Sequence, residues 1–410
     1  MELVIAISFV LLFVTIYVMT FFVLVNVENR KTLFLYPKSK KKYSVSVVVP
    51  CYNEEKSVKL TVEHILNSNY PKDKLEVIIA NDGSKDDTLK VARELEKKYP
   101  NVRVLDKPNS GKADTLNSAI RMARGELVAV VDADSFPEKD SIKKMVGYFD
   151  DPKMGAVTSF VFVRNKNHNF LTYIQSIEYV VMGWLRKLLD YVDSVYVTNG
   201  PLSLYRKDFL KKVGGFDKKS ITEDIEVTWN LLFHKYKTAM CLDARVDTLA
   251  PTKVKAWTRQ RVRWGVGGIQ ALVKYKKTFF KEGIFGAFIL PYVSFSIFLS
   301  IFIFFFSLYL FIKSLIVNAV RFGYSYAINS SIIKIGHFSF IPSVLFFFMA
   351  IMFIFSMAYY LYIIYQTKYE TKINLKKFFS IIFYTTAYLM LYPFVWIISF
   401  WRIFKRDYRW

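Results

Sequence analysis

Hydrophobic and polar positions follow two different rhythms along the first half of the chain. Continuous apolar runs, which predict strands buried on both faces, occur at Val45–Pro50, Leu75–Ala80, Val102–Leu105 and Leu127–Val131. Between these runs apolar residues recur at helical spacing, over Glu54–Leu66, over Thr88–Lys98 with Asp87 as its cap, and over Gly111–Arg124. Strands and helices that alternate at such short spacing predict an α/β domain, in which a parallel sheet is covered on both faces.

Four apolar blocks lie outside this pattern, at Leu3–Val25, Ile284–Ile312, Phe338–Tyr365 and Phe378–Trp401. Each reaches the roughly 20 residues that cross a hydrocarbon core of about 30 Å. The first block has no basic stretch before it and no small-residue cleavage site after it, so we expect a retained anchor and not a signal peptide. The chain is 53% hydrophobic with a mean hydropathy of +0.23, and these blocks account for the excess over a soluble enzyme.

The net charge of +23 is typical either of a nucleic-acid-binding protein or of a membrane protein with a basic collar. Six basic residues directly follow the first apolar block: Arg30, Lys31, Lys38, Lys40, Lys41 and Lys42. The positive-inside tendency then places the following domain in the cytosol and the N-terminus outside, with the collar against anionic headgroups. Because this placement explains the sign of the charge, we expect membrane lipid as a partner and no nucleic acid.

The C-terminal tail does not fit that topology cleanly. Three membrane crossings after a cytosolic domain would leave the tail outside the cell. Basic residues, which prefer the cytosolic side, nevertheless stand in the tail at Arg402, Lys405, Arg406 and Arg409. Either one apolar block does not cross the membrane, or the tail is an exception to the rule.

Polar clusters follow three of the predicted strands, at Cys51–Glu54, Asn81–Ser84 and Asp132–Asp134. The carboxyl ends of parallel strands meet at one edge of a sheet, and ligands of such sheets bind there. Asp132 and Asp134, one residue apart, can share a hard cation, since Mg²⁺ or Mn²⁺ takes oxygen ligands from few carboxylates and from substrate phosphates. We therefore expect a divalent metal site with Asp134 and Asp132.

Three further residues near this edge have both a structural and a functional interpretation. Asp82 can accept a hydrogen bond from a nucleobase, or its surroundings Asn81–Ser84 form a plain turn. Tyr52 offers an aromatic face to a base, or it is a core tyrosine. Lys112 begins a helix, where it can reach a phosphate with the help of the helix N-terminus, or it is a solvated surface lysine.

The run Thr222-Glu223-Asp224 opens a predicted helix over Glu223–Phe233. Thr222 is a natural N-cap, and acidic residues in the first turn suit the helix dipole, which is the structural interpretation. In the functional interpretation Asp224 removes a proton from a sugar hydroxyl. Partial burial would raise the pKa of this carboxyl toward the range that a general base needs.

Gln260, Arg263 and Trp264 form the most specific pattern, because their spacing puts them on one face of a helix. Arginine grips a diphosphate with two donors, and tryptophan stacks on the apolar face of a sugar ring. The stretches Phe170–Val192 and Val254–Lys277 are amphipathic with too many charges to span a bilayer. We expect helices at the membrane surface there, the alternative being ordinary domain helices.

Cysteine and histidine add no further site. The two cysteines, Cys51 and Cys241, cannot form a disulfide framework and suit a reducing compartment. The four histidines, at His64, His168, His234 and His337, show no metal-ligand spacing. We therefore treat all six residues as structural.

Taken together, these motifs resemble the family 2 glycosyltransferases of the processive, membrane-embedded kind, which include the poly-N-acetylglucosamine, hyaluronan, cellulose and chitin synthases. The resemblance rests on seven pieces in order: Val47–Glu55 (VVVPCYNEE), Asn81–Ser84 (NDGS), Gly111–Asn117 (GKADTLN), Asp132–Asp134 (DAD), Asn199–Arg206 (NGPLSLYR), Thr222–Asp224 (TED) and Gln260–Trp264 (QRVRW). It implies a catalytic domain of the GT-A (Rossmann-like) type, a UDP-sugar donor and a transfer that inverts the anomeric centre.

The resemblance also implies a role for each matching residue. On the donor side it points to Tyr52, Glu54, Asp82, Lys112, Asp132 and Arg263, with Asp134 and Asp132 on Mg²⁺ or Mn²⁺. Asp224 would be the catalytic base, and Glu223 would support it. The acceptor would contact Gln260, Trp264, Gly200 and Pro201.

These observations predict four parts: an N-terminal transmembrane helix (1–27), a cytosolic catalytic domain (43–252), an interface helix (253–282) and C-terminal transmembrane helices (283–410). We expect a multi-pass cell-membrane enzyme that polymerises a sugar, with N-acetylglucosamine favoured, onto a glycan or lipid acceptor and extrudes the product. An accessory membrane subunit is a further candidate partner. The alternative enzyme adds one or two sugars to a lipid, and a non-catalytic membrane scaffold is a third interpretation.

Overall fold

The computed structural model describes residues 2–281, 283–327, 344–370 and 374–406. Its α/β half is built on an eight-stranded sheet in the order β3-β2-β1-β4-β7-β6-β8-β5. The strands are β1 (Val45–Cys51), β2 (Leu75–Asp82), β3 (Val102–Lys107), β4 (Leu127–Val130), β5 (Ser135–Pro137), β6 (Met154–Val163), β7 (Ser203–Arg206) and β8 (Lys237–Thr248). All four strands that the sequence predicts are present.

The first four strands form the predicted parallel sheet. β1 pairs in parallel with β2 and with β4, and β2 pairs in parallel with β3. Their carboxyl ends therefore meet at one edge. The sheet then becomes mixed, because β7 runs antiparallel to both β4 and β6. The hydrophobic pattern does not predict this second half, because its strands interleave polar residues with apolar ones.

Helices cover both faces of the sheet, as expected. Val47 and Val49 pack into one core with α2 (Val58–Leu66), α3 (Thr88–Lys98) and α5 (Ser141–Val146), whereas Val48 faces a second core. Helices α4 (Lys112–Met122), α7 (Lys207–Lys212) and α8 (Glu223–Phe233) contribute to that second core. Successive side chains of a strand point to opposite faces, so the buried valine run of β1 supplies both cores.

Two predicted helix starts need correction. Glu54 lies in a turn, and α2 begins only at Val58, so Glu54 stays at the sheet edge. Asp87 stands at the N-cap position of α3 but makes no side-chain cap hydrogen bond. Asp86 takes that role instead, because its Oδ1 accepts from the backbone N–H of Thr88 at 3.1 Å.

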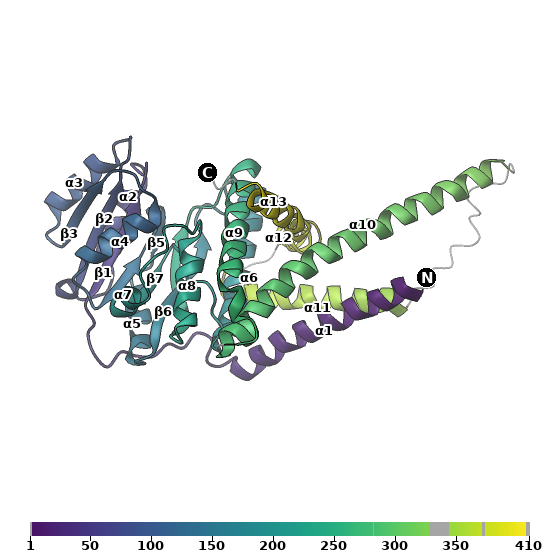
Figure 1. The fold of residues 1–410 in the computed structure, drawn as a ribbon, viewed down its shortest axis with the longest axis horizontal. Helices are drawn as coiled ribbons and strands as arrows, with labels where there is room; N and C mark the ends of the chain where they lie inside the picture. Colours follow the sequence, from purple (N-terminus) through teal and green to yellow (C-terminus); the bar gives the residue numbers. More distant parts are fainter. Residues whose placement is uncertain (1, 282, 328–343, 371–373, 407–410) are drawn as a thin grey trace.

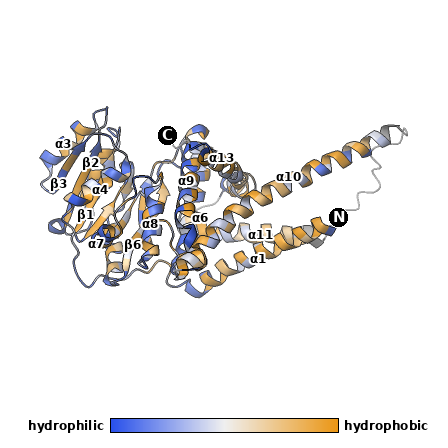
Figure 2. Ribbon diagram, viewed as in Figure 1, coloured by the Kyte–Doolittle hydropathy of each residue, from blue (hydrophilic) through white to orange (hydrophobic). Residues whose placement is uncertain are grey.

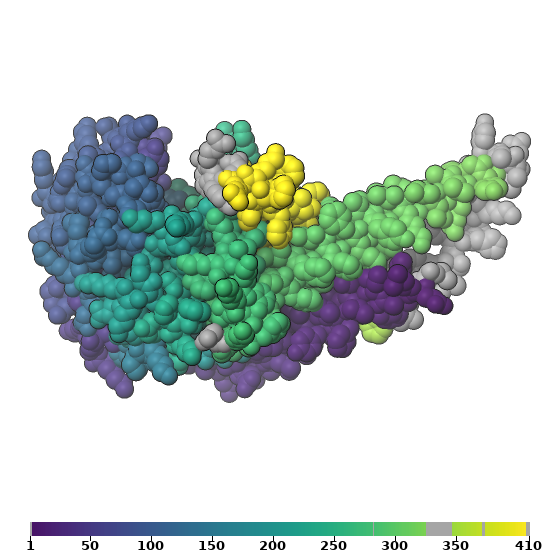
Figure 3. Space-filling model, in the orientation of Figure 1, coloured from purple at the N-terminus to yellow at the C-terminus, as the bar shows by residue number. Residues whose placement is uncertain are grey.

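Long apolar helices extend away from the α/β half (Figures 1 and 3). They are α1 (Glu2–Asn29), α10 (Leu290–Ala327) and α11 (Val344–Gln366), and most of their residues are hydrophobic (Figure 2). Within the described residues four helices are long and apolar enough to cross a membrane, the fourth running over Leu375–Phe404. Residues 338–343 of one predicted block lie outside the described residues. These helices agree with the predicted blocks.

The two amphipathic stretches form α6 (Phe170–Asp190) and α9 (Val254–Tyr275), which lie between the sheet and the apolar helices (Figure 1). α6 packs on β6 and β8 on one side and on α1, α11 and α12 (Leu375–Phe383) on the other. α9 packs on α8 and on α13 (Tyr392–Phe404). The predicted surface helices are thus layers between two halves of the molecule.

Candidate functional site

Lys112 joins two of the predicted acidic clusters. Its Nζ lies 2.6 Å from Oδ1 of Asp132, which follows β4, and 2.8 Å from Oε1 of Glu223, which begins α8. Lys112 itself is the first residue of α4, directly after Gly111, whose φ of 93° favours glycine. Three segments far apart in the sequence therefore converge on one ammonium group, at the carboxyl edge of the sheet.

A group of carboxylates surrounds this ammonium group. Burial, with the nearby charges of Asp132 and Glu54 adding to it, raises the pKa of Asp134 to about 6, while Lys112 acts in the opposite direction. Burial likewise raises the pKa of Glu54, which also lies near Asp132. Crowded, partly buried carboxylates of this kind are stabilised by a cation.

The carboxylate set fits a divalent metal only with help from a substrate. Within the described residues no three or more His, Cys, Asp or Glu side chains gather as a complete metal cage. Mg²⁺ usually keeps several waters and binds one or two carboxylates together with substrate phosphates. Asp132 and Asp134 match that donor set. Burial and the charges of Asp132 and Glu54 raise the pKa of Asp134, and a bound cation would offset both effects.

Asp82 lies beneath the loop before α4. Its Oδ1 accepts from Nζ of Lys107 and from the backbone N–H of Ser110, both at 2.9 Å, and its Oδ2 accepts from the N–H of Gly111 at 2.9 Å. These bonds lower the pKa of Asp82 although its burial opposes them. Asp82 therefore holds the Gly111 backbone that presents Lys112, and its predicted contact with a donor stays a prediction.

Tyr52 and Glu54 occupy the turn after β1. Tyr52 is 46% exposed, so the alternative of a core tyrosine is wrong. The backbone N–H of Glu54 donates to Oγ1 of Thr88 at 2.7 Å, and the Glu54 carboxylate accepts from Oγ of Ser57 at 2.5 Å. The turn is thus fixed at the edge of the sheet with an aromatic face open.

Gly200 lies directly against Asp132. The backbone N–H of Asp132 donates to the carbonyl of Gly200 at 3.2 Å. A Cβ at position 200 would stand 2.4 Å from Oδ2 of Asp132, so only glycine fits there without a shift. Pro201 follows at once in the sequence. The predicted acceptor residues Gly200 and Pro201 therefore belong to the same edge as the predicted donor residues.

Asp224 lies in the first turn of α8, beside Glu223. Burial and the charge of Glu223 raise the pKa of Asp224 to about 6, while the charges of Lys112 and Arg263 lower it. Its Oδ1 accepts from the N–H of Ile225 at 2.9 Å. A carboxyl with this pKa is largely ionised at neutral pH and still basic enough to accept a proton.

Helix α9 brings the QRVRW motif to Asp224. α8 and α9 cross so closely that a Cβ on Gly267 would lie 1.9 Å from Oγ1 of Thr222. Thr222 occupies the N-cap position of α8 but makes no side-chain cap bond, so its predicted capping role is wrong; the hydroxyl packs against α9 instead. Arg263 is exposed on α9, and its charge acts on Asp224.

Three charged residues that the sequence pattern left without a role lie on α6 and α9, the two helices next to the site. Arg186 of α6 donates to Oδ1 of Asn199. Burial lowers the pKa of Arg186, and the nearby charge of Asp224 opposes this shift. Glu178 of α6 pairs with Arg261 of α9. In the sequence these residues were visible only as charges within the two amphipathic stretches. Which way their side chains point depends on how α6 and α9 pack between the sheet and the apolar helices.

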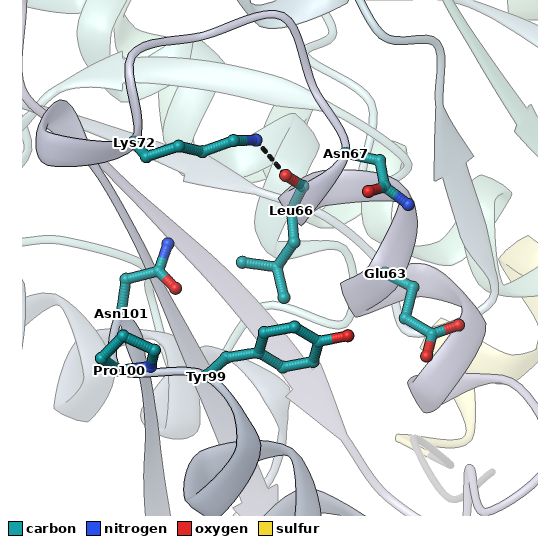
Figure 4. Close-up of a pocket in the computed structure, with 7 residues that line it drawn as sticks. All are labelled: Glu63, Leu66, Asn67, Lys72, Tyr99, Pro100 and Asn101. Atoms are coloured by element: carbon teal, nitrogen blue, oxygen red, sulfur yellow. Dashed lines mark hydrogen bonds between the residues drawn. The ribbon is translucent and has the colours of Figure 1, made fainter.

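A shallow pocket occupies the opposite edge of the sheet. Its lining comes from the ends of α2 and α3 and from the segments that precede β2 and β3, namely Glu63, Leu66, Asn67, Lys72, Tyr99, Pro100 and Asn101 (Figure 4). None of the predicted site residues lines it. We therefore assign no part of the candidate site to this pocket.

Comparison with known proteins identifies the family of the chain. Residues 42–267 match the model of the family described as glycosyltransferase-like family 2. The chain is 35% identical over 232 residues to poly-β-1,6-N-acetyl-D-glucosamine synthase of Staphylococcus epidermidis, with 56% of each protein covered. It is 34% identical over 268 residues to the probable glycosyltransferase YdaM of Bacillus subtilis, with 62% of this chain and 60% of that protein covered. The chain thus aligns with a little over half the length of these relatives.

The structure is similar to that of the mannosyltransferase PcManGT from Pyrobaculum calidifontis, solved in complex with GDP-Man and Mn²⁺. The TM-score is 0.58 at 20% identity, over 94% of this chain and 99% of that chain. This likeness extends through the apolar helices and confirms the predicted fold class.

Proposed function

The chain belongs to glycosyltransferase family 2, and from that membership we propose that it is an inverting, processive β-glycosyltransferase that polymerises N-acetylglucosamine from UDP-N-acetylglucosamine. The enzyme class, a nucleotide-sugar glycosyltransferase, follows from the family. One observation above all supports a shared donor and acceptor site: Lys112 lies within 2.8 Å of acidic residues from two separate motifs. The choice of sugar rests on the poly-β-1,6-N-acetyl-D-glucosamine synthases among the relatives.

In the proposed reaction Asp224 accepts the proton of the acceptor hydroxyl. The oxygen then attacks the anomeric carbon, the bond to the diphosphate breaks, and the configuration inverts. Glu223 keeps the pKa of Asp224 high enough for this task, and Lys112 and Arg263 stand nearby with positive charge for the departing diphosphate. Tyr52, Glu54 and Asp82 are the proposed contacts of the uridine.

We propose Asp134 and Asp132 as the protein ligands of a divalent cation, Mg²⁺ or Mn²⁺. Such a cation, when bound, neutralises charge on the diphosphate. The solved mannosyltransferase structure contains Mn²⁺, and the burial and neighbouring carboxylates that raise the pKa of Asp134 support a cation at this position. Ser135 and Thr248 hold the Asp134 carboxylate through their hydroxyls, at 3.3 and 3.5 Å.

We also propose that Leu375–Phe404 does not cross the membrane. The chain just before it contacts the catalytic half, where Glu370 pairs with Lys166 at 3.1 Å. Further along, Oγ of Ser399 donates to the carbonyl of Val262 on α9 at 3.4 Å. The chain thus contacts the catalytic half just before this segment and contacts the intervening helix α9 near the segment's end, whereas α10 extends away from the catalytic half (Figure 1).

This arrangement keeps the tail on the cytosolic side, where its basic residues prefer to be. The N-terminus is then outside, α10 leaves the cytosol and α11 returns to it. The exposed aromatic residues of the last segment, among them Phe394 and Trp401, face the hydrocarbon at the level of α6 and α9. Three helices (α1, α10 and α11) remain as proposed crossings, and the polymer would leave along them.

The experiment that tests this function supplies membranes containing the full chain with radiolabelled UDP-N-acetylglucosamine, UDP-glucose or UDP-glucuronate and sizes the products. We expect long polymer from UDP-N-acetylglucosamine alone. The Asp224→Asn variant should keep donor binding and lose transfer by about a hundred- to ten-thousandfold. Unchanged polymer output from this variant would refute the base assignment, and products of one or two sugars on lipid would refute processivity.

A further inference from the structure

A buried ion pair links the two helices that lie between the sheet and the membrane. Glu178 on α6 and Arg261 on α9 are each 1% exposed, and Nη2 of Arg261 lies 2.5 Å from Oε2 of Glu178. Neither residue touches the acidic clusters described above. A buried pair of this kind gains little stability over apolar residues of similar volume, because both ions are desolvated. Its presence calls for a role beyond holding the helices together.

The last helical segment completes the hydrogen bonding of this pair. The hydroxyl of Tyr388 donates to Oε2 of Glu178 at 2.8 Å, and the hydroxyl of Tyr392 donates to Oε1. Tyr388 in turn accepts from Nε1 of Trp257 at 2.7 Å. The Glu178 carboxylate is therefore satisfied on both oxygens by groups from α9 and from the last segment. These hydrogen bonds can form together only when α6, α9 and the last segment are packed against one another.

On its other side Arg261 contacts two predicted acceptor residues. Its Nη1 donates to Oε1 of Gln260 at 2.7 Å. Its guanidinium lies 4.1 Å from the ring centroid of Trp264, within cation–π range. Tyr179 supports the same indole, with its ring centroid 6.4 Å away. The guanidinium thus fixes the orientation of both Gln260 and Trp264 while Glu178 fixes the guanidinium.

We propose that Arg261 is a positioning residue, held by Glu178, that sets Gln260 and Trp264 for the acceptor and couples acceptor binding to the seating of the last helical segment. This inference rests on the proposed function, in which those two residues receive the acceptor chain. The donor residues do not depend on it. Loss of the pair should therefore weaken acceptor binding selectively, while donor binding and donor hydrolysis persist.

The test uses the full chain in membranes or detergent, UDP-N-acetylglucosamine, and a β-1,6-linked glucosamine oligosaccharide series as acceptor. Three quantities are measured: KM for the acceptor, KM for the donor, and UDP release without acceptor. For Arg261→Met and Glu178→Gln we expect the acceptor KM to rise about tenfold, with the donor KM within about twofold of the wild type. Shorter products should accompany the weaker acceptor binding.

Milder variants and a matched control keep the test decisive if Arg261→Met fails to fold. Arg261→Lys retains the charge but not the fork of donors, and Tyr392→Phe removes a single hydrogen bond. Both should raise the acceptor KM in the same direction by a smaller factor. Arg259→Met, which removes an exposed arginine of the same helix, should leave every quantity unchanged.

The outcomes separate this inference from the proposed function. An unchanged acceptor KM in the folded variants, or a donor KM that rises in parallel, overturns the positioning role. Additivity of Glu178→Gln and Arg261→Met in the double variant also overturns it, because residues acting as one unit are non-additive. If the wild-type chain transfers no sugar from any UDP-sugar, the proposed function itself fails.

Discussion

Gly267 of α9 and Thr222 at the start of α8 touch so closely that an added Cβ on the glycine would lie 1.9 Å from the threonine Oγ1. In a Gly267→Ala variant Thr222 has to move, and it carries Glu223 and Asp224 with it. Displacements of this order in a reacting centre cost about a hundredfold in rate, so we expect a loss of about that size in sugar transfer. Initial rates with labelled donor measure it.

The neighbouring glycine provides the control for that variant. An added Cβ on Gly268 has no heavy atom within 4 Å among the described residues. Alanine is also the better helix former, by about 1 kcal/mol. Gly268→Ala should therefore keep its activity and lose no thermal stability. Equal losses of transfer activity in the two variants would show that α9 tolerates no added methyl group at either position. The close contact between α8 and α9 would then not explain the loss in Gly267→Ala.

The pH dependence of kcat tests Asp224 as the proposed base. Because burial and Glu223 raise the pKa of Asp224 to about 6, the carboxylate loses its negative charge as the pH falls through that value. The base acts in its ionised form, so kcat should be constant above neutrality and should fall tenfold per pH unit well below pH 6. Glu223→Gln removes a negative neighbour, which lowers the pKa of Asp224 and moves the acid limb to lower pH. An acid limb that moves upward in this variant would contradict the assignment.

Lys112 should matter for the donor more than for the acceptor. A Lys112→Met variant leaves Asp132 and Glu223 without their shared counter-charge and removes a cation near the proposed diphosphate position. We expect kcat/KM for the UDP-sugar to fall about a hundredfold or more. Lys90→Met, at an exposed lysine of α3, serves as the control. An unchanged kcat/KM in Lys112→Met would show that the lysine only links Asp132 and Glu223 structurally.

Removal of divalent metal should stop transfer reversibly. We expect EDTA to abolish activity and Mn²⁺ or Mg²⁺ to restore it, because without a cation the carboxylates of Asp132 and Asp134 would repel the diphosphate. An Asp134→Asn variant should need a higher metal concentration for half-maximal activity. Asp73→Asn, at an exposed position before β2, should leave the metal concentration for half-maximal activity unchanged. Full activity in EDTA would contradict the metal assignment.

Reporter fusions test the proposed path of the last segment. A fluorescent protein fused after the C-terminus should fold and fluoresce, and alkaline phosphatase at the same position should be inactive, since the tail is proposed to be cytosolic. A phosphatase fused after Tyr324, at the far end of α10, should be active. The reverse result at the C-terminus would make Leu375–Phe404 a true crossing.

The sequence predicted the parallel half of the sheet because runs such as Val45–Pro50 are apolar on both faces and stand between helical repeats. It did not predict β7, because Ser203–Arg206 is short and mixes polar with apolar residues. This segment forms a strand only because it pairs with β4 and β6. Asp87 illustrates a local error of the same kind, since the choice between two adjacent aspartates depends on turn geometry.

The candidate site shows a similar division. Motif residues such as Asp132 and Glu223 were recognisable by type and position, but their common partner Lys112 became evident only in three dimensions. Helical spacing separated Arg263 from Arg261 within the QRVRW motif, but it did not show what Arg261 contacts. Which of the two arginines points inward depends on Glu178, more than 80 positions earlier.

The tyrosines that bind Glu178 also determine how this protein can be divided in the laboratory. A fragment that ends after α9 would expose the carboxylate and guanidinium to water or detergent and would leave the indole of Trp257 without its acceptor. Soluble versions made by cutting away the membrane helices are therefore poor substitutes for kinetic work with oligosaccharides. Purification should retain the chain through at least Tyr392, in a lipid-like environment.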